Sequence, residues 1–224
     1  MVDAAALSFL DGYLYRVMVE MLRSEGTQES GLYDFYKARI EQERYALSGY
    51  DRLLLNYLSE NFDNDKQKVL HAGIGVGTLA CALALAGFKV AGLERDRGRT
   101  IAASRVRSAV IERWPAIEER YQLMPGTFPT TVIGSDWINN QTILVFTNCG
   151  SDWPEELTDK IIDLFPSFCG VILDARLFGK VRDSEEERQA LISRIQGQGL
   201  AASPLPETNR LGAYYFHFQR QPGE

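Results

Sequence analysis

The 224-residue chain is poor in the residues that bind metals or form disulfides. It contains two histidines and three cysteines, and the cysteines, Cys81, Cys149 and Cys169, are widely spaced among apolar neighbours. This pattern favours buried free thiols over a disulfide or a zinc site. We therefore expect no metal.

Long hydrophobic runs are also absent. No apolar stretch approaches the roughly 20 residues that a membrane-spanning helix needs, and residues 1–10 lack the basic flank of a secretory signal. We expect a cytoplasmic protein with no membrane segment. A chain of this length with 45% hydrophobic residues can bury one substantial α/β core.

Positive charge is in deficit, since the formal net charge is -6. A negative protein repels the phosphate backbone of nucleic acids, which normally binds a basic face. The exception is the arginine-rich stretch 95–99, continued by Arg105 and Arg107. We interpret it as a solvated helix face with intrahelical ion pairs, and nucleic acid is not an expected partner.

Residues 1–65 have the pattern of an all-helical portion. Apolar side chains recur at helical spacing over about 4–22, 32–47 and 50–62. The polar linker 63–66 then precedes the first strand. We expect this portion to form a unit distinct from residues 66–224.

From residue 68 onward, strands and helices alternate, which is typical of a doubly wound, mostly parallel sheet with helices on both faces. Strands are predicted near 68–72, 89–93, 121–124, 142–147 and 169–173, and helices near 78–86, 98–114, 154–165 and 184–196. Asp183 is the predicted cap of the last helix. Segments 200–205 and 212–219 have no helix between them, so they should form an antiparallel pair at the sheet edge.

The most informative motif is the strand 69–72 that runs directly into three alternating glycines, Gly73, Gly75 and Gly77. A helical stretch follows, and the next strand ends in Glu94. Strand, glycine turn and helix together bring bare backbone close to a nucleoside-containing ligand. A carboxylate at the end of the second strand can bind the two ribose hydroxyls.

With these motifs and the closing hairpin, the chain resembles the class I S-adenosylmethionine-dependent methyltransferases over about residues 68–220. The resemblance implies a seven-stranded Rossmann-like sheet, S-adenosylmethionine as cofactor and a helical lid formed by residues 1–65. It implies cofactor contacts from the three glycines, from Glu94 and its neighbour Arg95, and from three further positions. Those positions are Thr127 and Phe128 beside the adenine, and Asn148 near the methyl donor.

The sequence departs from the family pattern at two points. His71 occupies the position of the usual acidic residue, two before the first glycine. An imidazole cannot accept from the ligand's ammonium group as a carboxylate does, so we expect weaker or different binding there. The Asn/Asp-Pro-Pro-aromatic signature of base and amide methylases is missing, which argues against nitrogen methylation of those groups.

The methyl acceptor is expected to be a small molecule. The region 33–50 is rich in aromatic and charged residues, and the candidate acceptor contacts are Tyr36, Arg39, Glu43 and Tyr45, with Trp153 from the edge of the sheet. Methyl transfer depends mainly on proximity and alignment, so no catalytic residue is assigned. The helical start is also a candidate homodimer surface.

Two alternatives remain open from the residues alone. A glycine loop with an acidic strand end also suits a nicotinamide-dependent oxidoreductase, although Thr78 stands where its third glycine is expected. The second alternative is a binding or scaffold protein that retains the fold without turnover.

Overall fold

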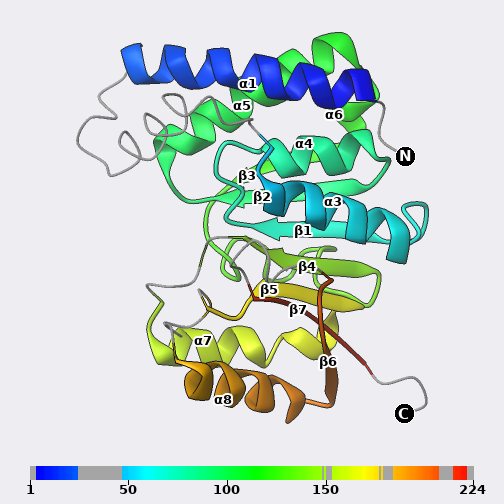
Figure 1. The fold of residues 1–224 in the computed structure, drawn as a ribbon, viewed down its shortest axis with the longest axis vertical. Helices are drawn as coiled ribbons and strands as arrows, with labels where there is room; N and C mark the ends of the chain where they lie inside the picture. Colours follow the sequence, from blue (N-terminus) through cyan, green and yellow to red (C-terminus); the bar gives the residue numbers. More distant parts are fainter. Residues whose placement is uncertain are drawn as a thin grey trace.

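The computed structural model describes residues 4–24, 47–147, 149, 153–176, 178, 184–206 and 214–220. Its centre is a seven-stranded sheet in the order β3-β2-β1-β4-β5-β7-β6 (Figure 1). The strands are β1 (Lys68–Ala72), β2 (Lys89–Glu94), β3 (Tyr121–Pro125), β4 (Thr142–Phe146), β5 (Gly170–Asp174), β6 (Leu200–Pro204) and β7 (Tyr215–Arg220).

Five strands are parallel, and the last two form an antiparallel hairpin in which β7 lies between β5 and β6. The predicted doubly wound, seven-stranded sheet with a terminal hairpin is therefore confirmed. The register sets His71 of β1 opposite Gly92 on one side and Val145 on the other. The carboxyl ends of β1, β2 and β4 consequently meet along one edge of the sheet.

Helices cover both faces of the sheet, and each face buries its own hydrophobic cluster (Figure 1). The first face carries α1 (Ala4–Ser24), α3 (Gly49–Asn61), α4 (Thr78–Leu85), α5 (Arg97–Arg113) and the short α6 (Ile117–Arg120). The second face carries α7 (Glu155–Ile162) and α8 (Glu185–Gln196), with the 3₁₀ turn η2 (Phe165–Ser167).

Local signals in the sequence account for the ends of two of these helices. Ser48 and Asp51 form a reciprocal capping box at the start of α3. At α8 the cap is Ser184, whose hydroxyl accepts from the backbone N–H of Glu187. The prediction of Asp183 as this cap was wrong by one residue, because serine directly before the glutamate run supplies the same hydrogen bond.

The N-terminal helix α1 packs on the outer side of α5 and α4 (Figure 1). Phe9 stacks on Tyr13 and meets the edge of Trp114, and the guanidinium of Arg113 lies over the Phe9 ring. Asp11 links α1 to the start of α3, because its carboxylate accepts from the Leu47 backbone N–H and pairs with Arg52. The helix predicted over 32–47 lies outside the described residues except for Leu47.

The second histidine of the chain, His217, is a packed residue of β7. Its Nδ1 lies 3.0 Å from the Tyr57 hydroxyl, and its ring meets the edge of Phe62. It therefore fastens α3 to the sheet. Among the described residues, no helix is both long and apolar enough to cross a bilayer.

The docking of α3 on the sheet gives a stability test. Leu58 is fully buried, so Leu58→Ala should lower the free energy of unfolding by about 2–5 kcal/mol. The adjacent Ser59 is exposed, and Ser59→Ala should change it by no more than about 0.5 kcal/mol. Urea unfolding of both variants measures the difference. Equal values would contradict the docking.

Candidate functional site

The glycine loop that follows β1 is folded back against the end of β2. The backbone N–H groups of Gly73 and Ile74 both donate to the Leu93 carbonyl, at 2.9 and 3.1 Å. All three glycines have positive φ, at 73°, 60° and 80°. Side chains other than glycine rarely adopt these angles, so the loop geometry itself selects glycine.

Two of these glycines are also required by close neighbours. A Cβ at Gly73 would lie 2.7 Å from the Cβ of Cys149, and one at Gly77 would lie 2.9 Å from the Tyr121 hydroxyl. Cys149 donates from its thiol to the Ala72 carbonyl at 3.3 Å. The chain after β4 therefore passes directly over the start of the glycine loop.

Glu94 joins the loop to the end of β2. Its side chain is buried, with Oε2 accepting from the Gly75 N–H and Oε1 from the Asp96 N–H, both at 2.9 Å. A carboxylate has about four acceptor positions, so two remain beyond these bonds. The described arrangement thus fits a ligand with two adjacent hydroxyls, such as a ribose.

His71 lies in the interior, with 1% of its surface exposed. Its Nε2 is 2.6 Å from the hydroxyl of Thr147, the first residue after β4. Burial lowers the pKa of His71 to about 3, so the imidazole is neutral at physiological pH. No described residue forms a hydrogen bond with its Nδ1.

The two residues proposed for the adenine differ in their surroundings. Thr127 is exposed after β3, and its backbone N–H donates to the Thr131 hydroxyl. Phe128 is 3% exposed and packs on the rings of Phe146 and Phe168. Their roles beside the adenine remain predictions.

The other predicted contacts are mostly beyond the described part of the chain. Arg95 is exposed directly after Glu94. Trp153 is half-buried, edge-on to Phe146 and Phe178 at 5.8 and 5.7 Å between ring centroids. Asn148 and the four candidate acceptor contacts, Tyr36, Arg39, Glu43 and Tyr45, lie outside the described residues.

The sequence reasoning missed a buried acid at the end of β5. Asp174 is 3% exposed and forms a two-pronged ion pair with Arg176, whose guanidinium also lies 5.6 Å from the Tyr214 ring. The signal was available, because Leu173-Asp174 repeats the pattern of Leu93-Glu94, a buried strand that ends in an acid.

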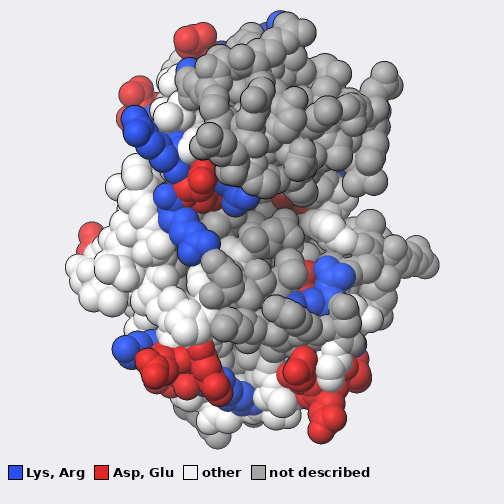
Figure 2. Space-filling view, turned by 90° about the vertical axis from the view of Figure 1, so that its left-hand side faces the viewer, with Lys and Arg blue, Asp and Glu red and all other residues white. Residues whose placement is uncertain are grey.

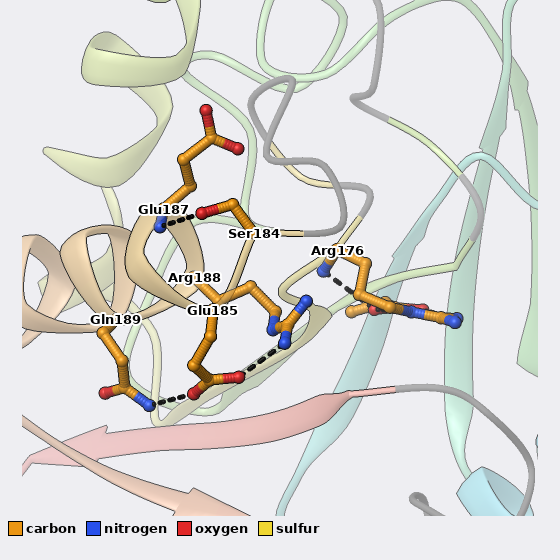
Figure 3. A network of polar contacts seen from close by, with 7 residues as sticks. Arg176, Ser184, Glu185, Glu187, Arg188 and Gln189 are labelled. Atoms are coloured by element: carbon orange, nitrogen blue, oxygen red, sulfur yellow. Dashed lines mark hydrogen bonds and ion pairs between the residues drawn. The ribbon is translucent and has the colours of Figure 1, made fainter.

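The start of α8 holds the same tyrosine from another direction. Arg188 pairs with Glu185, which also accepts from Gln189 (Figure 3). The guanidinium of Arg188 lies 4.2 Å from the Tyr214 ring. Arg176 and Arg188 therefore position Tyr214 beside the end of β5. This network borders the sheet edge that carries the glycine loop.

An open groove of about 640 Å³ lies elsewhere, between α1 and α5. None of the residues that line it belongs to the glycine loop or to the ends of β2, β4 and β5. Its lining includes Tyr13, Arg16, Arg105 and Arg113. The groove is thus separate from the edge at which doubly wound sheets bind their ligands.

Comparison with solved structures identifies the fold. The magnesium protoporphyrin IX methyltransferase of Synechocystis, in a crystal structure with bound S-adenosylmethionine, is similar over 99% of both chains, with a TM-score of 0.57 and 14% identity. No protein-family model and no curated protein sequence matches the chain.

Two further similar structures differ in their acceptors. A putative RNA methyltransferase from Pyrococcus horikoshii matches at a TM-score of 0.52 and 14% identity, over 93% of this chain and 98% of its own. Mitomycin 7-O-methyltransferase matches at 0.52 and 18%, over 93% and 67%. The chain therefore has the fold of class I S-adenosylmethionine-dependent methyltransferases.

The glycine loop can be tested against a matched position. Gly77 and Gly199 share a φ of 80°, but a Cβ at Gly199 would meet nothing within 4 Å. Gly199→Ala should lower the free energy of unfolding by about 1–2 kcal/mol, because alanine is strained at this positive φ. Gly77→Ala should cost more, because Tyr121 is buried and cannot move away from the added methyl group. Thermal and urea unfolding compare the two variants, and an equal loss would contradict the contact.

The low pKa of His71 predicts a pH dependence. Its folded pKa of about 3 lies below the ordinary value of 6.5, so the unfolded chain binds more protons between these values. Stability should therefore fall as the pH is lowered through this range, by about 1.4 kcal/mol per pH unit for this residue. His71→Gln should show a correspondingly shallower loss between about pH 6 and pH 4 in urea titrations. Parallel curves for the two proteins would argue against a buried neutral imidazole.

Proposed function

We propose that the protein is a methyltransferase that transfers the methyl group of S-adenosylmethionine to a small molecule. The observation that carries this proposal is the bond between Gly75 and Glu94, which holds a glycine turn and a carboxylate together at the edge of the sheet. This edge includes the point where strand order reverses between β1 and β4. Doubly wound folds bind ligands at that point.

We expect different residues to bind different parts of the cofactor. Glu94 would bind the ribose hydroxyls, and Thr127 and Phe128 would lie beside the adenine. Arg95 would lie next to this adenosine half of the cofactor. The glycine loop would pass under the amino-acid part, with Asn148 near the methyl donor. The cofactor supplies an electrophilic methyl group on a sulfonium, and the protein aligns the acceptor with it.

The acceptor would lie beyond β4, over the end of β5 and the start of β7. Tyr50, near the start of α3, packs on Tyr215, which lies opposite Asp174 where β7 pairs with β5. The start of α3 thus reaches this edge of the sheet, and we expect residues 1–65 to act as a lid. Tyr36, Arg39, Glu43 and Tyr45 would contribute from the lid, and Trp153 from the sheet.

Charge favours a small acceptor over a nucleic acid. Figure 2 shows the side toward which the parallel strands point, and acidic side chains gather at its lower end. The first turns of α7 and α8, which begin there, contain five glutamates, Glu155, Glu156, Glu185, Glu186 and Glu187. These charges repel a phosphate backbone.

Calorimetric titration with S-adenosylhomocysteine tests the cofactor assignment. Glu94→Gln keeps the size of the side chain but replaces an acceptor oxygen with a donor group. Affinity should fall about 10- to 100-fold, the usual loss for a hydrogen bond to a charged group. The exposed Glu119→Gln is the control and should bind like the unmodified protein.

Two results would contradict the proposal. One is the absence of binding by the unmodified protein at millimolar S-adenosylhomocysteine, which would favour a scaffold without turnover. The other is quenching of tryptophan fluorescence by micromolar NADH, which would favour an oxidoreductase.

A further inference from the structure

His71 and Thr147 form a hydrogen-bonded pair at the point where the ends of β1 and β4 meet. Their side chains are 2.6 Å apart, although 76 positions separate them in the sequence. The same place contains Gly73, because a Cβ on that glycine would lie 3.4 Å from the Thr147 carbonyl. The pair is therefore part of the base of the glycine loop.

A neutral imidazole has one N–H and one lone pair, and the hydrogen bond of one nitrogen decides the role of the other. If the Thr147 hydroxyl donated to Nε2, then Nδ1 would carry a buried proton with no acceptor among the described residues. If Nε2 instead donates to Thr147, Nδ1 presents a lone pair. Buried donors are left unpaired less often than buried acceptors, which favours the second arrangement.

We propose that His71 binds the cofactor through Nδ1, which accepts a hydrogen bond from the ammonium group of the amino-acid part of S-adenosylmethionine, directly or through one buried water. Thr147 fixes the tautomer that leaves Nδ1 available. This inference rests on the proposed function, because it concerns the same ligand. It gives the histidine a binding role in place of the carboxylate.

A neutral acceptor suits this position for a physical reason. Burying a carboxylate costs free energy unless the carboxylate is paired. At position 71 the described surroundings would offer a carboxylate one partner, the Thr147 hydroxyl. Burial holds the pKa of the imidazole at about 3. The ring can therefore accept from a cation without introducing a charge into the free protein.

His217 provides an internal control. The register of the sheet places it level with His71 but three strands away, opposite Ile172 of β5. It is also buried, its Nδ1 contacts Tyr57, and its Nε2 has no partner among the described residues. Its unpaired nitrogen faces Gly170, where a Cβ would lie 2.6 Å away.

The test compares two probes, S-adenosylhomocysteine and 5′-methylthioadenosine, by titration calorimetry. Both contain the adenosine thioether, and the second lacks the amino-acid part. His71→Asn can place an amide oxygen near Nδ1, whereas His71→Gln places its amide near Nε2. His71→Gln should weaken binding of S-adenosylhomocysteine about tenfold and leave methylthioadenosine unchanged. His71→Asn should retain the preference for S-adenosylhomocysteine.

Thr147 and His217 complete the set of variants. Thr147→Val should reduce the preference for S-adenosylhomocysteine over methylthioadenosine. Thr147→Ser should preserve this preference, since serine keeps the hydroxyl. His217→Gln should affect neither probe. Thermal unfolding checks that each variant is folded.

Nitrogen-15 NMR of the unmodified protein gives a second readout that does not depend on variants. In the free protein the His71 signals should show protonated Nε2 and bare Nδ1. The Nδ1 signal should shift with S-adenosylhomocysteine and not with methylthioadenosine. A protonated Nδ1, or equal losses for both probes in His71→Gln, would overturn the proposal. Failure of both probes to bind the unmodified protein would instead reject the proposed function.

Discussion

The parallel pairing of β1 with both β2 and β4 is the constraint on which the candidate site depends. It brings three chain segments, far apart in sequence, to one edge at the same level. The loop after β1 can then bond to Glu94 on one side and receive Cys149 on the other. A one-residue slip of β1 would turn His71 to the opposite face of the sheet, and a slip of β2 would do the same to Glu94.

Much of this arrangement could be predicted from the sequence because it is encoded locally. The alternation of buried strands and helices gave β1 at its observed residues, and the glycines marked the loop whose backbone needs positive φ. The last two strands were predicted because no helix separates them. These features depend on residues that are neighbours in the chain.

The unpredicted features depend on contacts between distant residues. The pair formed by His71 and Thr147 and the passage of Cys149 over Gly73 exist only once β1 and β4 are side by side. The ion pair of Asp174 with Arg176 could have been inferred from the strand that ends in an acid, but its association with Tyr214 could not. Hydrophobic spacing predicts elements, whereas polar partners at the sheet edge follow from topology.

Asp11 has a consequence for the chain between α1 and α3. Its carboxylate holds Leu47 and Arg52, so the chain that enters α3 is fixed against the middle of α1. The entropy of closing a flexible segment between two fixed points grows slowly with its length, by about 0.6 kcal/mol for each doubling. On this scaling, insertions or deletions in the stretch that contains Tyr36, Arg39, Glu43 and Tyr45 would cost little stability. Related proteins could change their acceptor in that stretch while the sheet and the cofactor edge stay the same.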